Sequence, residues 1–152
     1  MSDPKVHHEL RLGLEGHFES EVLFAYTTAS LDPRLPPLFS TPALVGMMEA
    51  ATSHAVDSAL DPGKITVGTR VEVDHLKAAT QGTMIKATAR LAEINGRFLT
   101  FDVEAHAGHE IVGRGRIVRA VVDLARIQQR ATKPHHQQAS GDKSAPAHHK
   151  SH

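Results

Sequence analysis

Glu49 is the residue whose type fits its surroundings least. It interrupts the most apolar stretch of the sequence, residues 42–51, in the run Met47-Met48-Glu49-Ala50-Ala51. Burying a carboxylate without a partner is costly, so this group is expected to be paired, protonated or used in chemistry. One interpretation is a general base, and the other is a structural partner at the seam of a dimer.

His75 and Thr41 are two further groups that could take part in proton transfer. His75 ends a row of alternating residues and replaces an apolar residue there, after Val67, Thr69, Val71 and Val73. Imidazole is well matched to proton transfer at physiological pH, although a single histidine is more often structural. Thr41 lies where a helix should begin. Its hydroxyl either caps that helix or lies beside free amides that can stabilise a negative charge.

The helix that carries Thr41 and Glu49 has a marked beginning and end. Ser40 or Thr41 can cap it, Pro42 suits its first turn, and Asp61-Pro62-Gly63 ends it. Apolar residues recur at helical spacing and also occupy other sides, so we expect protein to cover most of its circumference. These residues are Leu44, Met47, Met48, Ala51 and Ala55, with Val45, Gly46, Ala50 and Val56 on the other sides.

Period-two patterns predict the strands around this helix. The first strand is expected near residues 17–25, and residues 30–39 form a loop or lid because they contain three prolines. Four more strands follow the helix, and Asn95-Gly96 is a strong hairpin signal between two of them. We expect the four to form an antiparallel meander over residues 66–76, 83–94, 97–107 and 111–123.

One long helix and a curved antiparallel sheet of about five strands leave few arrangements. Wrapping the sheet around the helix buries the apolar surface of both. We therefore predict an α+β protein with the hotdog fold, in one domain spanning residues 1–131. Residues 132–152 are rich in Pro, Gln, Ser, Lys and His and contain no large apolar residue, so we predict a disordered polar tail.

The composition excludes several classes of function. Lys and Arg number 17, as do Asp and Glu, so no net charge draws the chain to nucleic acid or to an anionic membrane. The absence of cysteine excludes disulfides, thiolate zinc sites and a cysteine nucleophile. No apolar stretch could span a bilayer, and we predict a soluble cytoplasmic protein. His106 and His109 lack a third metal ligand nearby in sequence, so we expect neither a metal nor a cofactor.

Four segments together resemble the fluoroacetyl-CoA thioesterase family of hotdog proteins in their order and spacing: Thr41-Pro-Ala-Leu-Val-Gly-Met-Met-Glu49, Val67-Gly68-Thr69, Val73-Asp-His75 and Arg119-Ala-Val. The resemblance covers about residues 9–130. It implies an acyl-CoA thioesterase in which Thr41, Glu49 and His75 are catalytic, with Thr41 or Glu49 as the nucleophile. It also implies that Gly68 offers a backbone amide to the thioester carbonyl, and that Arg119 contacts coenzyme A or anchors Glu49.

The sequence departs from this family in two places. Fluoroacetate-selective members have an aromatic residue in the loop before the helix, whereas residues 32–37 contain none, and Pro42 replaces a glycine. We therefore expect that this protein hydrolyses short or medium acyl-CoA thioesters, as the resemblance implies, but we do not expect fluoroacetate specificity. Leu35 and Phe39, with Leu38 and Tyr26, are candidates for the acyl pocket. The alternatives are a non-catalytic acyl-CoA-binding module and, less favoured, a hydratase or dehydratase.

The spacing of the candidate residues bears on oligomeric state. Thr41 and Glu49 are eight residues apart, which is roughly 12 Å along a helix and about 80° around it. They meet only through substrate or water, or if a two-fold partner supplies one of them. The resemblance likewise implies a homodimer with sites at the subunit interface. Arg114 and Arg116 could meet the phosphates of coenzyme A, or could be solvated surface charges.

Overall fold

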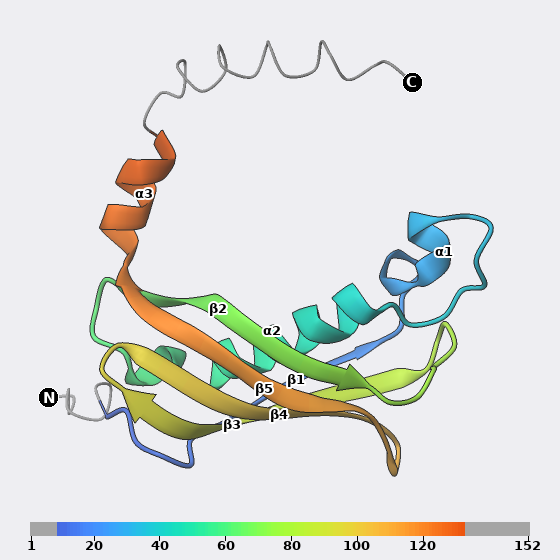
Figure 1. The fold of residues 1–152 in the computed structure, drawn as a ribbon, viewed down its shortest axis with the longest axis horizontal. Helices are drawn as coiled ribbons and strands as arrows, with labels where there is room; N and C mark the ends of the chain where they lie inside the picture. Colours follow the sequence, from blue (N-terminus) through green and yellow to red (C-terminus); the bar gives the residue numbers. More distant parts are fainter. Residues whose placement is uncertain (1–8, 133–152) are drawn as a thin grey trace, which may run out of the picture.

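Five strands form one antiparallel sheet in the order β1-β3-β4-β5-β2, and the long helix α2 lies across its concave face (Figure 1). This computed structural model describes residues 9–132. The elements are β1 Glu15–Glu21, the 3-10 helix η2 Phe24–Tyr26, α1 Thr28–Leu31, α2 Thr41–Val56, the 3-10 helix η3 Asp57–Ala59, β2 Lys64–His75, β3 Met84–Asn95, β4 Phe98–Ala107, β5 Glu110–Asp123 and α3 Leu124–Thr132.

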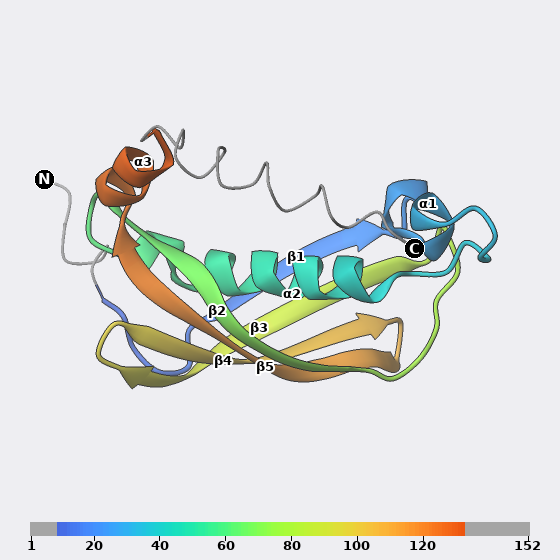
Figure 2. The ribbon, with the colours of Figure 1, turned by 45° about the horizontal axis from the view of Figure 1, so that its top comes forward.

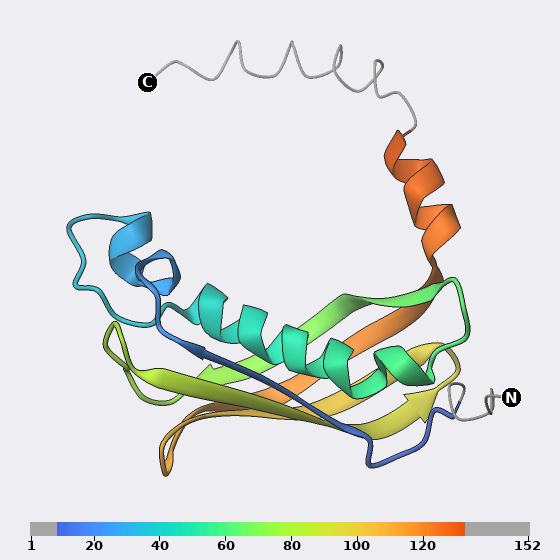
Figure 3. The ribbon, with the colours of Figure 1, turned by 180° about the vertical axis from the view of Figure 1, so that it is seen from behind.

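Helix α2 begins where the sequence predicts, but the sheet covers only one of its sides. Ser40 is the N-cap, and its Oγ accepts a hydrogen bond from the Ala43 amide at 3.2 Å. The buried residues of α2 face the sheet, whereas Gly46 is exposed and Glu49 is half-buried. In Figures 2 and 3 the side of α2 turned away from the sheet meets no other helix or strand of residues 9–132. The predicted cover over most of its circumference is therefore wrong for the single chain.

The core lies between α2 and the concave face of the sheet. Its largest fully buried side chains include Phe101, Leu44, Met48, Ile85 and Leu91. Strand β1 approaches α2 so closely that a Cβ on Gly16 would overlap backbone atoms of Ala51 and Ala55. This close approach, which only glycine permits, holds the first strand against the helix.

Strands β3, β4 and β5 form the predicted meander, but β2 does not belong to it. The turns at Gly96 and Gly108 have φ values of 62° and 63°, in the left-handed region that glycine adopts readily. Strand β2 pairs with β5 at the far edge of the sheet, and not with β3. The connection between β2 and β3 contacts the loop before α2, where the Phe39 amide donates to the Ala79 carbonyl at 2.8 Å. The predicted four-strand meander is thus wrong at its first step.

A β-bulge in β2 changes which residues face the helix. The register with β5 shifts between Gly68 and Arg70. Because side chains alternate along a strand, one extra residue moves every later side chain to the other face. Thr66 and Gly68 face α2 before the bulge, and His75 faces it afterwards. The predicted uniform row from Val67 to His75 does not exist.

Helix α3 follows β5 directly and projects away from the sheet at the end where β2 begins (Figure 1). It ends at Thr132, the residue at which the predicted disordered tail starts. Residues 133–152 lie outside the described part of the chain, so the prediction of a tail stays a prediction. Among residues 9–132, none of the helices combines the length and the apolar character needed to cross a membrane.

Candidate active site

Thr41 and His75 are in direct contact. Their Oγ1 and Nδ1 atoms lie 2.8 Å apart, a hydrogen bond between the first residue of α2 and the last residue of β2. Thr41 is free to make this bond because the cap of α2 is Ser40. The Phe39 ring meets the imidazole edge-on, with ring centroids 6.0 Å apart. A hydroxyl bonded to an imidazole is the arrangement that activates an alcohol as a nucleophile.

The second ring nitrogen of His75 is buried and has no hydrogen-bond partner in the described residues. Which tautomer is present therefore depends on the bond with Thr41, in which either group can be the donor. When Nδ1 accepts the Thr41 proton, the imidazole acts as its base. A hollow of about 380 Å³ opens beside this pair, lined by Thr28, Leu38, Phe39, Thr41, His75, Leu76, Lys77 and Ala78.

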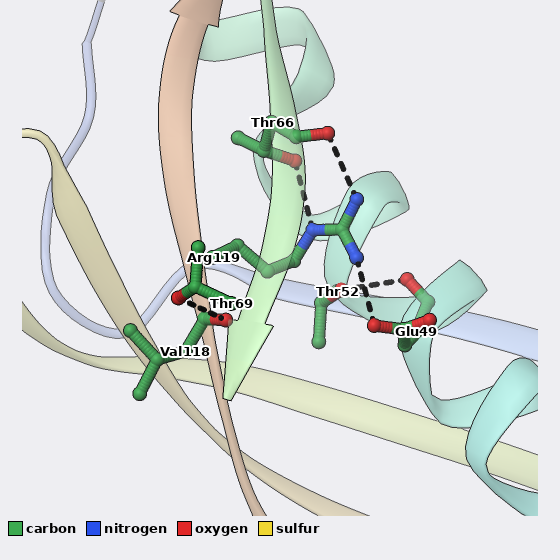
Figure 4. Close-up of polar contacts among 6 residues, drawn as sticks. All are labelled: Glu49, Thr52, Thr66, Thr69, Val118 and Arg119. Atoms are coloured by element: carbon green, nitrogen blue, oxygen red, sulfur yellow. Dashed lines mark hydrogen bonds and ion pairs between the residues drawn. The ribbon is translucent and has the colours of Figure 1, made fainter. Parts of the chain in front are cut away.

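Glu49 lies in a second cluster, about two turns further along α2. Arg119 reaches from β5 across β2, and its Nη1 lies 3.4 Å from Glu49 Oε2 (Figure 4). The Glu49 side chain is 35% exposed and that of Arg119 only 10%. The carboxylate is thus paired and partly open to solvent, so the expectation that it is buried is wrong for the single chain.

Thr66 holds the Arg119 guanidinium in place. Arg119 Nε donates to Thr66 Oγ1 and Nη2 donates to the Thr66 carbonyl, both at 2.9 Å (Figure 4). With its other nitrogen near Glu49, the guanidinium is fixed on three sides. Of the two roles that the family resemblance implies for Arg119, contact with coenzyme A or anchoring of Glu49, this contact is of the second kind. Sequence reasoning missed Thr66, because a threonine in a strand carries no signal that separates it from its neighbours.

Gly68 leaves room for the Glu49 carboxylate. A Cβ at this position would overlap Glu49 Oε2 and lie 3.6 Å from Arg119 Nη1. Only a residue without a side chain allows the carboxylate to lie against this part of β2.

We predict that Gly68→Ala lowers kcat for the reaction at this site at least about tenfold, because the methyl group displaces the Glu49 carboxylate. Stability should change little, since the atom displaced is the end of a flexible, partly exposed side chain. Turnover and thermal unfolding measured on the same sample check both expectations. Gly46→Ala, on the open side of α2, is the matched control, because an added Cβ meets nothing within 4 Å there. Equal turnover in the two variants would contradict the prediction.

The two clusters do not meet within one chain. Thr41 and Glu49 are separated by eight residues of α2, roughly 12 Å along the helix. Both border β2, whose outer edge is unpaired in the described chain. The single chain therefore presents two parts of a site, a hydroxyl with an imidazole and a carboxylate with an arginine.

The other candidate residues have separate surroundings. Leu35 is 46% exposed on the loop before α2 and does not line the hollow beside Thr41, whereas Phe39 does. Arg114 and Arg116 lie near Glu104 and Asp102, at 3.9 Å and 2.9 Å, as surface ion pairs. His106 pairs with Glu104 at 2.9 Å. Within residues 9–132, no three His, Cys, Asp or Glu side chains gather as a metal site.

Comparisons with known proteins agree with this architecture. Residues 24–125 match the model of the fluoroacetyl-CoA-specific thioesterase family. The fluoroacetyl-CoA thioesterase of Streptantibioticus cattleyicolor is 37% identical over 92 residues, which are 60% of this chain and 66% of that protein, just under two thirds of its length.

Solved structures give the same result. A structure of a fluoroacetyl-CoA thioesterase superposes with a TM-score of 0.74 at 31% identity, covering 83% of this chain and 99% of that one. A thioesterase superfamily member from Thermus thermophilus superposes with a TM-score of 0.73 at 27% identity, covering 80% and 90%. The predicted hotdog fold is confirmed. With a match over residues 24–125, the chain belongs to the fluoroacetyl-CoA-specific thioesterase family.

Proposed function

We propose that this protein is a thioester hydrolase that converts acyl-CoA to a free acid and coenzyme A. The observation that carries the proposal is the 2.8 Å contact between Thr41 Oγ1 and His75 Nδ1, beside a hollow with mostly apolar walls. A solved relative is described as a complex with fluoroacetate and coenzyme A, at 32% identity and a TM-score of 0.71 over 78% of this chain and 99% of that one.

The reaction proceeds in two steps. Thr41 Oγ1 attacks the thioester carbonyl while His75 takes the hydroxyl proton, the carbon–sulfur bond breaks, and His75 returns the proton to the departing thiolate. Glu49 then takes a proton from a water molecule, whose oxygen attacks the carbonyl carbon of the acyl-threonine. The bond between that carbon and Thr41 Oγ1 breaks, the free acid leaves, and the proton held by Glu49 returns to the Thr41 oxygen. In this proposal the Gly68 amide donates to the carbonyl oxygen as its charge develops. Arg119, held by Thr66, keeps the carboxylate in position.

The active unit is a homodimer in which the partner supplies the missing part of each site. Edge strand β2 has an unpaired outer edge, and Val71 near its middle is 43% exposed, so a second β2 can pair there. A two-fold axis near Val71 sets the His75 end of one strand beside the Gly68 region of the other. This pairing joins Thr41 and His75 of one copy with Glu49 and Arg119 of the other.

The hollow beside Thr41 fits a short or medium acyl group. Leu38, Phe39 and Leu76 form its apolar part, and Leu35 lies on the adjoining loop. Walls of this kind select acyl chains by size more than by a single substituent, so fluoroacetate selectivity is not part of the proposal. Coenzyme A enters as part of the substrate, and no metal or cofactor is proposed. A cytoplasmic location, where acyl-CoA is available, belongs to the same proposal.

The test is a panel of acyl-CoA esters from acetyl upward, with release of free thiol as the readout and Glu49→Gln as the background. Turnover of at least one ester above that background is expected, and the panel then identifies the acyl group. Sedimentation of the same sample should show a dimer. Binding of acyl-CoA without any turnover above the background would instead favour the non-catalytic binding module.

A further inference from the structure

A second cleft, distant from Thr41, lies where α3 leaves the sheet. It encloses about 870 Å³ between α3, the end of β5 and the turn between β3 and β4. Its charged lining consists of Lys64, Arg97, Arg126 and Arg130 against one carboxylate, Asp123. We refer to it as the α3 cleft.

The charges in the α3 cleft are not balanced. Lys64 Nζ lies 2.8 Å from Asp123, and this hydrogen bond, with a smaller contribution from Arg126, holds the pKa of Asp123 below its ordinary value. The carboxylate is therefore already engaged. Within residues 9–132, no ion pair or side-chain hydrogen bond joins Arg97, Arg126 or Arg130 to another residue, although the Arg97 guanidinium lies over the Phe98 ring.

Elsewhere in the described chain, paired and unpaired cations both occur. Five other cations of the described chain each lie beside a carboxylate: Arg34, Arg70, Lys77, Arg114 and Arg116. On α3, in contrast, Arg126 and Arg130 are four residues apart and lie on one face of the helix, an arrangement that disfavours the helix unless an anion neutralises it. Three guanidinium groups around one cleft are the donors that phosphate oxygens prefer.

The α3 cleft lies on the same face of the sheet as the Glu49 cluster. Lys64, Thr66 and Gly68 alternate along β2 opposite Asp123, Val121 and Arg119 of β5, so the side chains follow one another along one face. Gly68 lies four positions along the strand from Lys64, a distance of about 13 Å. In a CoA thioester, the extended pantetheine arm separates the reacting carbonyl from the phosphates by a comparable length.

We propose that the α3 cleft binds the phosphate groups of coenzyme A through Arg97, Arg126 and Arg130. The identity of the ligand rests on the proposed thioesterase function. A thioester held near Glu49 and Gly68 then has its phosphates at the end of the sheet, and its charge neutralises the unpaired arginines. The site acts in binding and not in the chemical step.

The test compares one acyl group carried on coenzyme A with the same group carried on pantetheine, which lacks the nucleotide phosphates. The double variant Arg126→Gln, Arg130→Gln should raise KM for the CoA ester at least about tenfold and leave kcat unchanged. Its kinetics on the pantetheine ester should match the wild type. Lys86→Gln with Arg90→Gln removes the same charge from exposed positions of β3 outside the cleft, and should change neither KM.

Two results would overturn the inference: an unchanged KM for the CoA ester, or an equal loss on both esters. Direct binding of adenosine 3′,5′-bisphosphate separates this inference from the proposed reaction. If the wild type hydrolyses neither ester, the thioesterase proposal fails, yet binding of the bisphosphate by the wild type and its loss in the arginine variant still support the cleft. Absence of binding in the wild type would refute the cleft.

Discussion

Glu49→Gln is expected to lower kcat for acyl-CoA hydrolysis by about a hundredfold or more, which is what a positioned base contributes. Glutamine keeps the size of the side chain but cannot accept a proton from water. Arg119 remains bonded to Thr66, so the site keeps its shape. The ion pair is 3.4 Å long and partly exposed, so its loss should cost less than about 1 kcal/mol of stability.

Thiol release under saturating substrate measures this effect. Glu93→Gln is the matched control, because Glu93 is an exposed carboxylate on β3, a strand that β4 and β5 separate from β2. The control should retain wild-type turnover. If Glu49→Gln also retained wild-type turnover, Glu49 would be a structural residue with no part in the chemistry.

Mixing two inactive variants is expected to restore activity. Glu49→Gln and His75→Asn each disable every site of their own homodimer. In a mixed dimer, one site combines the intact Thr41 and His75 of one copy with the intact Glu49 of the other. Random exchange makes half of the dimers mixed, so the rate should recover to roughly a quarter of the wild-type value.

The subunits are exchanged by unfolding and refolding the two variants together. Each variant unfolded and refolded alone is the control, because refolding by itself should restore no hydrolytic activity. Thr41→Val mixed with His75→Asn provides a second control, since both groups belong to the same part of the site and should not complement each other. Recovery in this second mixture, or none in the first, would show that the sites are not shared between chains as proposed.

Local patterns in the sequence were sufficient to predict most of the helices and strands. Ser40 and Pro42 placed the start of α2 because capping and the missing proline donor are properties of single residues. Period-two patterning with Asn95-Gly96 placed β3 and β4 within one residue of their observed bounds, since a side chain's face and a turn's φ are local properties. Thr41, Glu49 and His75 could also be selected as candidates, because each has a polar type or terminal position that its neighbours do not share.

Contacts between distant parts of the chain required the tertiary structure. Strand β2 pairs with β5 and has a bulge after Gly68. Both features depend on which strand edges meet, and the period-two pattern of β2 would be the same whether it paired with β3 or with β5. The bulge turns both Gly68 and His75 toward α2, which sequence alternation alone would have placed on opposite faces. Thr66 entered the site only through its bonds to Arg119, 53 residues away. The sequence by itself thus determined most elements and the candidate side chains, whereas the tertiary structure decided their partners. Partner choice depends on packing between segments that no local pattern records.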